Sequence, residues 1–446
     1  MSTAVHRIEV ADGVPDLYVS DGYTGLMILV TFRGVPLGDI RIKAHHGMVS
    51  SGYLANRIAQ DFCSRLVQLW LEEKMNCDDT GAAAGALPSI DAIVCTCDRP
   101  ADLRRCLQSL NETSYVRKTI IVVDNGLQCQ ATYDIAERYG ARYVRERKRG
   151  LDFARNAGLE AGESDLVAFA DDDVVVDPMW LGSIAGAFRS DEAIACVTGL
   201  TMPFELETEA QEMFERYCDG GLRRGYGRWV YDRSNLLPAA AGRVGAGANM
   251  AFRAAVLREI GGFDEALDCG TPAKAGGDSD MFYRVIRRGY KICYEPRALA
   301  WHRHRRGMDE LRSQLAGYST AVYAFLTKCV LEYRDFDALS VGYSWFKGRH
   351  FKNLLLGIVG RGPQPWRMSV VEAKGALQGP IAYLRAKSYV SHLRLQEGSE
   401  RRGRLNRQGK APVGTSNFAH RTSALLAHLK GSRRRRRSAE RDHTHP

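Results

Sequence analysis

Short apolar runs alternate with amphipathic stretches over the middle of the chain. IDAIVCT at 90–96 and LVAFA at 166–170 are apolar throughout or nearly so, which is typical of strands buried on both faces. ADLRRCLQSLNE at 101–112 instead has apolar residues at helical spacing. The series continues with KTIIVVDN, ATYDIAERYG, ARYVRE and LDFARNAGLEAG. We therefore predict an α/β fold with a mostly parallel sheet and helices on both faces.

The pattern changes on either side of this region and divides the chain into four segments. Residues 1–85 contain two strand-like runs split by RGVPLG and then a long amphipathic stretch, which predicts a small α+β unit with a hairpin and a helix. A proline-containing linker leads to the α/β domain at 86–306. Residues 307–395 predict a helical extension. The last segment, 396–446, lacks sustained apolar periodicity, and we expect it to be disordered.

The charge of the chain is concentrated in that last segment. The 446 residues have a net charge of +10, but residues 401–446 carry 13 Lys and Arg against two Asp and Glu, and the preceding residues carry 49 against 50. The tail includes the run SRRRRRS at 432–438. Such a run is either a solvated end or a contact for an anionic surface. We expect at most a peripheral contact with anionic membrane and no specific nucleic acid partner.

Cysteine usage and the lengths of the apolar runs indicate the compartment. The 11 cysteines show no C-x-x-C spacing and no histidine cluster beside them, so we expect reduced thiols rather than disulfides or a zinc site. The N-terminus lacks a basic start followed by an apolar run, and no run reaches the roughly 18 apolar residues of a membrane span. These features predict a cytoplasmic protein, with any membrane contact at the inner face.

Acidic residues follow three of the predicted strands. Asp98 comes after the first strand, Asp124 ends the second, and LVAFADDDVVVDP places Asp171, Asp172 and Asp173 in a row. The carboxyl ends of parallel strands meet at one edge of a sheet, where α/β folds bind ligands. Carboxylates gathered there need a divalent cation, a basic side chain or water to neutralise them. We favour a cation, and oxygen ligands indicate Mg²⁺ or Mn²⁺.

A second group of polar residues lies further along the chain. GAGAN at 245–249 lets the backbone approach a ligand closely, and AGGDSDMFYRVIRRG places Asp278 and Asp280 at the start of a helix. Asp278 is either a helix cap or a base near a substrate hydroxyl. KICYEPRALAWHRHRRG is strand-like and ends with His302 and His304 on one side of an extended chain. A histidine there could complete a metal site that the aspartates begin.

Eight motifs between residue 90 and about residue 306 carry a family resemblance. They are IVCTCDRPADLRRCLQSL, IIVVDNG, RGLDFARNAGL, VAFADDDVVVDPMWL, GAGANMAFR, GGFDEAL, GGDSDMFYR and YEPRALAWHRHR. In this order and spacing, about half of the chain resembles the nucleotide-sugar-dependent glycosyltransferases of family 2. The resemblance implies the Rossmann-like GT-A fold, a nucleotide-sugar donor and a cation.

The resemblance also implies residues that bind the donor. They are Thr96, Asp98, Asp124, Asn125, Arg155 and Asp171. Thr96 and Asp98 would line the nucleotide pocket, and Asp124 would hydrogen bond the base. Arg155 would approach the base or the diphosphate, and Asp171 would face the ribose.

The metal ligands and the catalytic base follow in the same way. The aspartate triplet corresponds to the D-x-D element of the family, with Asp173 on the cation that bridges the diphosphate. Asp172 could take that place, because three consecutive acids leave the register open. His302 matches the histidine near the metal. Asp278 matches the catalytic base, and Asp280 is its competitor for that role.

Two departures from the family pattern affect these roles. Gly277 stands where many relatives have a glutamate before the base, so the surroundings of Asp278 are expected to differ. Cys95 and Cys97 stand where relatives often have a proline and an aromatic residue, which removes simple stacking on the donor's base.

The resulting prediction is an inverting hexosyltransferase that moves a sugar from a UDP-, GDP- or TDP-sugar to an acceptor hydroxyl, with a metal as Lewis acid and an aspartate as general base. The alternatives are a nucleotidyltransferase or pyrophosphate-handling enzyme, and a non-catalytic nucleotide-sugar-binding protein. The acceptor is a glycan, a lipid-linked molecule or a small molecule. We expect it to contact residues 203–243, where Tyr226, Trp229 and Tyr231 lie among arginines.

Overall fold

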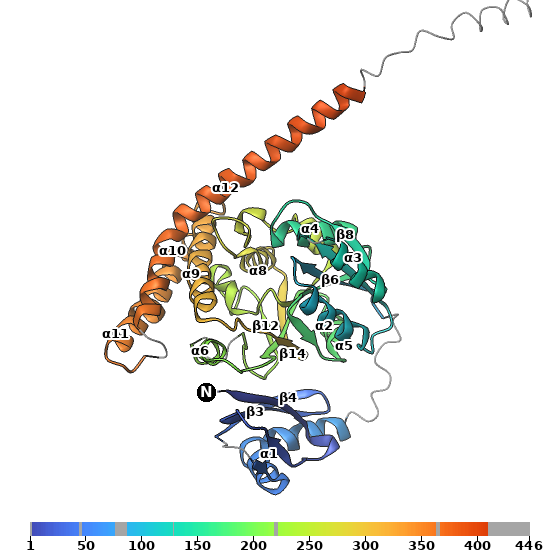
Figure 1. The fold of residues 1–446 in the computed structure, drawn as a ribbon, viewed down its shortest axis with the longest axis vertical. Coiled ribbons are helices and arrows are strands. Elements are labelled where there is room, and N and C mark those ends of the chain that lie inside the picture. Colours follow the sequence, from blue (N-terminus) through green and yellow to red (C-terminus); the bar gives the residue numbers. More distant parts are fainter. Residues whose placement is uncertain are drawn as a thin grey trace, which may run out of the picture. The chain divides into compact units, whose positions relative to one another are not determined.

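The computed structural model describes residues 2–43, 47–75, 87–127, 129–217, 222–362 and 366–408, with side chains except those of 217 and 397–408. Residues 1–390 form one compact unit and 391–446 a second. Figure 1 labels the helices and strands. All nine cysteines among the described residues are free thiols.

A small sheet and one long helix form the N-terminal part of the first unit. The sheet contains β1 (Thr3–Glu9), β3 (Gly25–Phe32) and β4 (Val35–Lys43), β2 (Leu17–Val19) pairs with β5 (Gly47–Val49), and the helix is α1 (Ser51–Met75). The predicted hairpin, β3 with β4, and the predicted helix are both observed. β1, which pairs in parallel with β3, is a strand that the pattern did not indicate. Most of the predicted linker lies outside the described residues.

The two faces of β3 bury different sets of residues. Leu26 and Val30 face α1 and share a core with its Leu54. Met27 and Leu29 point the other way, as the two-residue period of a strand requires. On that side they pack against the α/β domain at Leu200, Met202, Leu206 and Leu299. The N-terminal sheet therefore shares buried contacts with the α/β domain.

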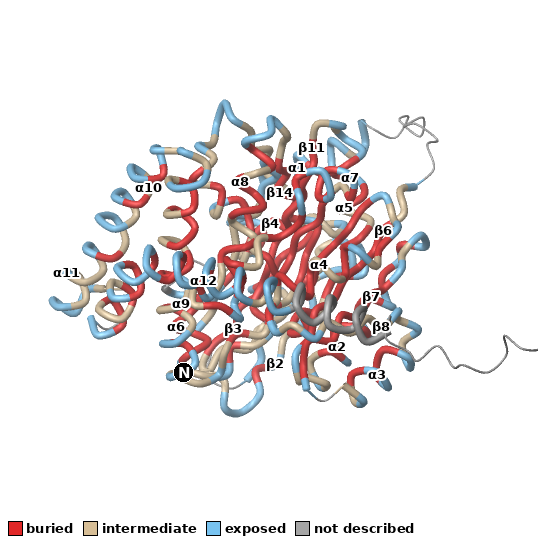
Figure 2. Tube along the Cα trace, turned by 90° about the horizontal axis from the view of Figure 1, so that it is seen from above, coloured by how far each residue is buried: buried red, intermediate tan, exposed pale blue. Residues whose placement is uncertain are grey.

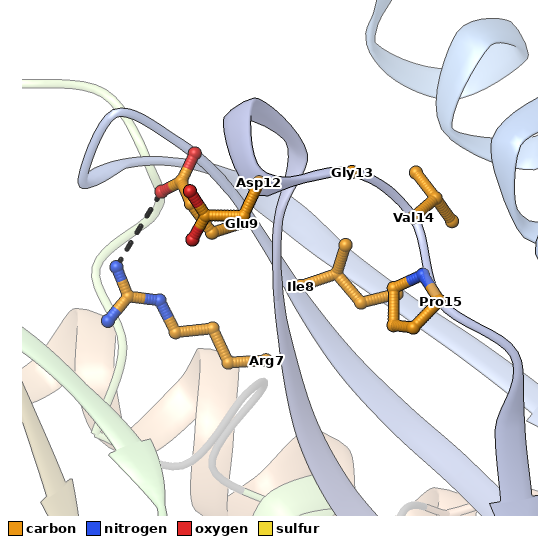
Figure 3. A pocket seen from close by; sticks show the side chains of 7 residues that line it. All are labelled: Arg7, Ile8, Glu9, Asp12, Gly13, Val14 and Pro15. Atoms are coloured by element: carbon orange, nitrogen blue, oxygen red, sulfur yellow. Dashed lines mark ion pairs between the residues drawn. The ribbon is translucent and has the colours of Figure 1, made fainter.

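A hollow of about 630 Å³ opens in the N-terminal part (Figure 3). It is lined by Arg7, Ile8, Glu9, Asp12, Gly13, Val14 and Pro15. Arg7 and Glu9 form an ion pair at 3.8 Å beside it. None of these residues is a predicted site residue, so the hollow is separate from the candidate site.

The central sheet has nine strands. They are β6 (Ile90–Thr96), β7 (Lys118–Asp124), β8 (Arg142–Arg145), β9 (Leu166–Asp171), β10 (Val174–Val176), β11 (Ile194–Pro203), β12 (Trp229–Tyr231), β13 (Asn249–Arg253) and β14 (Lys291–His302). Their order is β10-β14-β11-β13-β9-β6-β7-β8, with β12 beside β14. β10, β12 and β13 run against the direction of the other strands. The predicted α/β class with a mostly parallel sheet is confirmed.

Helices cover both faces of this sheet (Figures 1 and 2). They are α2 (Pro100–Asn111), α3 (Cys129–Arg138), α4 (Leu151–Ala161), α5 (Trp180–Ser190), α6 (Glu209–Tyr217), α7 (Ala254–Glu259) and α8 (Gly277–Arg287). Ala92 and Val94 of β6 share a core with α2, α3 and α5. Ile93, between them, faces α4, where a Cβ on Gly158 would lie 2.6 Å from the Ile93 Cγ2. Neighbouring residues of β6 thus enter opposite layers, which is why the strand is apolar throughout.

The C-terminal part is helical, as the spacing from 307 to 395 predicts. Its helices are α9 (Met308–Leu331), α10 (Asp337–Trp345), a π-helix (Phe346–Phe351), α11 (Lys352–Ile358) and α12 (Trp366–Gln408). The prediction of disorder is wrong for 396–408, because good helix formers such as Arg, Glu, Gln and Leu continue α12 to Gln408. The rest of that segment, with the arginine run, lies outside the described residues. Among those described, no helix has the length and apolar character needed to cross a bilayer.

His350 predicts a pH dependence of stability. The residue is 2% exposed, and burial lowers the pKa of its side chain from 6.5 to about 4. Between these values the unfolded chain binds a proton that the folded chain does not, so stability is lost as the pH falls below 6.5, by about 1.4 kcal/mol per unit. Urea unfolding across this range measures the loss. His350→Phe should remove most of this slope, and an unchanged slope in that variant would contradict the assignment.

Candidate active site

The turn between β9 and β10 sets the geometry of the three aspartates. Asp171 ends β9, and β10 begins at Val174, which pairs with His302 of β14. This register places His302 beside the turn. Asp172 and Asp173 form the turn itself. Asp171 and Asp173 lie close to His302, whereas the carboxylate of Asp172 contacts Thr96 and Arg99.

Asp171, Asp173 and His302 form a group that fits a metal ion. One oxygen of each carboxylate and one imidazole nitrogen all lie within 4.8 Å of one another. His302 Nε2 is 3.3 Å from Asp173 Oδ1. This oxygen is buried and accepts no well-formed hydrogen bond from the described residues. It therefore has a lone pair available for a cation.

Buried side chains hold the ring of His302 in place. His302 Nδ1 lies 3.0 Å from His304 Nδ1, and His304 Nε2 lies 2.9 Å from Glu215 Oε1 on α6. Burial lowers the pKa of His304 and favours its neutral form. If His304 donates from Nε2 to Glu215, its Nδ1 accepts the Nδ1–H of His302. Nε2 of His302 is then left for a metal, an orientation typical of metal-binding histidines.

Basic side chains already neutralise part of the triplet. Arg99 Nη1 is 3.1 Å from both Asp172 Oδ1 and Asp173 Oδ2, and Arg305 Nη1 is 3.9 Å from Asp173 Oδ2. Burial raises the pKa of Asp173, but His302, Arg99 and Arg305 outweigh it and hold the pKa well below its usual range. Burial lowers the pKa of His302, and the Asp173 carboxylate raises it above its usual value. The charge of the triplet alone therefore does not require a divalent cation.

Asp172 has partners different from those of its two neighbours. Its Oδ2 accepts a hydrogen bond from Thr96 Oγ1 at 2.8 Å, and its Oδ1 faces Arg99. Burial, together with the Asp173 carboxylate, raises the pKa of Asp172 to about 7. The geometry favours Asp173 over Asp172 as a metal ligand. It also places Asp171, predicted to face the ribose, with Asp173 and His302 in the candidate metal site, which we call the metal-binding group.

Asp278 lies in the first turn of α8 with a half-buried, firmly held carboxylate. Its Oδ2 accepts a hydrogen bond from Gly247 N at 3.0 Å and its Oδ1 one from Ser279 N at 2.7 Å. The N-cap of α8 is Gly276, whose φ of 117° suits glycine. Since Asp278 does not cap the helix, the interpretation of Asp278 as a cap is not supported. The interpretation as a base remains a prediction.

Arg155 connects Asp278 to the triplet. Its buried guanidinium contacts Gly247 O at 3.2 Å, Asp171 Oδ1 at 3.7 Å and Asp152 Oδ1 at 3.1 Å. A Cβ on Gly247 would lie 2.9 Å from Arg155 Nη2 and 3.1 Å from Asp278 Oδ2, so the close approach needs glycine there. The metal-binding group and Asp278 thus belong to one site.

Asp280 is not brought to this site. It is 0% exposed, and its oxygens lie 2.9 Å from Lys328 Nζ and 2.8 Å from Arg284 Nε. Tyr333 OH donates a third contact at 3.0 Å. A carboxylate buried with these partners has no access to an acceptor hydroxyl. The geometry therefore favours Asp278 over Asp280 as the base.

The loops after β6 and β7 are braced by the residues predicted to bind the nucleotide. Asp98, at φ 57°, accepts a hydrogen bond at 2.7 Å from the backbone N of Leu127, in the loop after β7. Asp124 is fully buried and accepts one from Tyr143 OH at 2.8 Å. Asn125 accepts one from Gly150 N at 2.7 Å. Their contact with a nucleotide stays a prediction.

Four residues of the site had no part in the prediction, namely Arg99, Arg305, Glu215 and Asp152. Arg99 follows Asp98 directly in the first motif, a position that could have drawn attention to it. Asp152 lies in the motif RGLDFARNAGL, three residues before Arg155, whereas Glu215 lies in none of the motifs. Asp152 is buried against α8, and burial together with Asp268 raises its pKa well above the usual value. Its Oδ2 has no hydrogen-bond partner among the described residues.

Asp152 fills the space beside Gly277, the position at which the family resemblance leads us to expect a glutamate. A Cβ on Gly277 would lie 1.9 Å from Asp152 Oδ2. Gly277→Ala must therefore shift Asp152 or the start of α8, and we expect a loss of about 2 kcal/mol in unfolding free energy. Asp152→Ala should relieve the clash, so the double variant should lose less than the sum of the single losses. Urea unfolding of all three variants measures this coupling, and strict additivity would contradict it.

Comparison with known proteins assigns this region. Residues 91–261 match the family described as glycosyl transferase family 2. They are a family 2 glycosyltransferase domain. The match includes the aspartate triplet, Arg155 and the GAGAN loop, whereas Asp278 and His302 follow it.

Curated relatives of the family 2 domain are themselves named as glycosyltransferases. The pre-mycofactocin glycosyltransferase of Mycobacterium tuberculosis is 30% identical over 224 residues, which cover 48% of this chain and 43% of that protein. The glucosyl-dolichyl phosphate glucuronosyltransferase of Haloferax volcanii is 23% identical over 257 residues, which cover 53% of this chain and 78% of that protein. The chain thus spans less than half the length of the first relative.

A solved structure also resembles the chain. The mannosyltransferase PcManGT of Pyrobaculum calidifontis, in complex with GDP-Man and Mn²⁺, matches with a TM-score of 0.45 and 15% identity, covering 66% of this chain and 87% of that one. No feature of the site rests on this likeness.

Proposed function

We propose that the protein is an inverting glycosyltransferase that moves a sugar from a nucleotide-diphosphate-sugar donor to an acceptor hydroxyl. One observation carries the proposal. In a family 2 domain, the guanidinium of Arg155 contacts both Asp171 of the metal-binding group and the Gly247 backbone that holds Asp278. This contact supports a shared site in which a diphosphate leaving group would bind beside the candidate base.

Asp171, Asp173 and His302 would hold the divalent cation. The buried Oδ1 of Asp173, which accepts no well-formed hydrogen bond from the described residues, supports this fit, as does the 4.8 Å spread of the three ligand atoms. Two carboxylate oxygens with one imidazole nitrogen suit Mn²⁺ better than Mg²⁺, which prefers oxygen alone. When bound, such an ion stabilises the negative charge of a departing diphosphate as a Lewis acid. Arg99 adds positive charge beside it.

Asp278 would take the proton of the acceptor. As the acceptor oxygen bonds to the anomeric carbon, the bond from that carbon to the diphosphate oxygen breaks, and the diphosphate leaves with the electron pair. The hydroxyl proton moves to the Asp278 carboxylate, whose orientation Gly247 N and Ser279 N fix. Attack on the face opposite the leaving group inverts the anomeric configuration.

A panel of UDP-, GDP- and TDP-sugars tests the proposed function. Purified protein should bind one of them in the presence of Mn²⁺ and slowly release its nucleoside diphosphate to water, as measured by chromatography. Neither binding nor hydrolysis with any donor, under Mn²⁺ and under Mg²⁺, would overturn the proposal. Pyrophosphate release from a nucleoside triphosphate and a sugar phosphate would instead support the nucleotidyltransferase alternative. Donor binding without hydrolysis or transfer, even when acceptors are supplied, would support the alternative of a non-catalytic nucleotide-sugar-binding protein.

A further inference from the structure

α10, the π-helix and α11 follow one another directly from Asp337 to Ile358, and many of their residues are exposed (Figures 1 and 2). Large apolar side chains among and beside these residues form an apolar stripe. The side chains of this apolar stripe are between 36% and 68% exposed. They are Phe336, Leu339, Tyr343, Phe346, Phe351, Leu355, Ile358 and Val359. An exposed apolar surface of this kind commonly marks an interaction site.

The π-helix keeps the apolar stripe on one side. Up to Phe346, and again from Phe351 to Ile358, successive members are three or four residues apart, the spacing of one α-helical face. The step from Phe346 to Phe351 is five residues, and it lies inside the π-helix. Because the hydrogen bonds of a π-helix span five residues, that step also returns to the same face. π-Helical turns of this kind occur often at functional sites.

A neighbouring face of these helices packs on the rest of the first unit. Ala338, Gly342 and His350 are buried there. Tyr323 OH of α9 donates a hydrogen bond to Gly342 O at 3.2 Å, and its ring lies 5.9 Å from that of His350. Of the apolar stripe, Phe346 contacts the His350 ring, with 5.9 Å between the ring centroids. The other members form a second apolar face that the described residues leave largely exposed.

The charges around the apolar stripe indicate what covers it. From 338 to 371 the sequence has five Lys and Arg and no Asp or Glu. Lys347 and Lys352 are exposed next to Phe346 and Phe351. Aromatic and aliphatic side chains with flanking lysines are typical of helices that lie in the interface of an anionic bilayer. Two copies of this face would repel each other, and lysine is depleted in protein interfaces.

We propose that the apolar stripe binds the surface of an anionic lipid bilayer, with its aromatic and aliphatic side chains in the headgroup region and Lys347 and Lys352 on lipid phosphates. This contact belongs to the folded part of the chain and differs from the one expected of the arginine tail. It does not depend on the proposed enzymatic activity.

Vesicle co-sedimentation of the full chain tests the proposal. We expect binding to phosphatidylcholine vesicles that contain phosphatidylglycerol, and much weaker binding to phosphatidylcholine alone. Lys347→Gln with Lys352→Gln should lower the partition coefficient about thirtyfold. Phe351→Gln, Leu355→Gln and Ile358→Gln together should remove the part of the binding that resists high salt.

Two controls separate this surface from others. Val67, Leu71 and Met75 of α1 are also exposed apolar residues at helical spacing, but Glu72 and Glu73 lie among them, so their joint change to Gln should leave binding unchanged. Changing the five arginines at 433–437 to Gln should leave the salt-resistant part intact. Loss of all binding in this tail variant would overturn the proposal. Full binding by the apolar-stripe variant, in which Phe351, Leu355 and Ile358 are changed to Gln, would overturn it too. The proposal would also be overturned if the wild-type chain were a dimer in solution and the apolar-stripe variant a monomer.

Discussion

Asp278→Asn is expected to slow sugar transfer about a thousandfold while leaving donor binding almost unchanged. The carboxylate takes up the acceptor proton only as the new bond forms, so its loss affects the transition state and not the bound donor. Asparagine keeps the shape of the side chain, and an oxygen still able to accept from Gly247 N. The measurement is the single-turnover transfer rate beside donor affinity from calorimetry, once a donor is known.

A matched change at Asp280 provides the control. Asp280→Asn removes the charge that pairs with buried Lys328 and Arg284, so we expect it to destabilise the fold by about 3 kcal/mol. The protein that remains folded should transfer sugar at a rate near that of the wild type. Near wild-type transfer by Asp278→Asn, or a thousandfold loss in folded Asp280→Asn, would reverse the two assignments.

Asp173→Ala is expected to weaken Mn²⁺ binding more than a hundredfold, and metal-dependent donor binding with it. Even the loss of an outer-shell partner of a metal ligand costs about 10–100-fold in affinity, and Asp173 supplies the unpartnered oxygen itself. Titration of Mn²⁺ followed by calorimetry measures the effect without any donor. Transfer activity should disappear in the same variant.

Asp172→Ala is the matched control for this prediction. Its carboxylate contacts Thr96 and Arg99 and is not among the three candidate ligands, so we expect a loss of less than tenfold in Mn²⁺ affinity. Equal losses in the two variants would show that the metal-binding group is misassigned. A larger loss of Mn²⁺ affinity in Asp172→Ala than in Asp173→Ala would show that Asp172 is the metal ligand.

Sequence patterns predicted the elements that carry the site because these elements follow from local spacing. The apolar run 90–96 and the helical spacing of 101–112 became β6 and α2 within a residue or two. Topology rules then placed Asp98, Asp124 and the triplet at one edge of the sheet. The direction of β13, antiparallel to β9, could not be derived in this way, because strand order depends on packing between distant segments.

The partners of the charged residues also lay beyond prediction from sequence. Three consecutive carboxylates appeared to need a cation, but Arg99 and Arg305 lie against them in the fold. Asp280 was a competitor on spacing alone, and only the position of Lys328 on α9 shows that its carboxylate is buried in an ion pair. Glu215, 89 residues before His304, orients the histidine pair although no motif marks it.

By itself, the sequence determined the α/β class, the residues at the strand ends and the choice of Asp278 and His302 as candidates, because apolar periodicity and motif order are local properties of the chain. The tertiary structure decided which of these side chains share a site. The pairing of Val174 with His302 turns Asp173 toward the histidine, and the Thr96 hydroxyl and Arg99 hold Asp172 elsewhere. Such choices depend on the register of strands distant in sequence, and a shift of one residue would exchange the two aspartates.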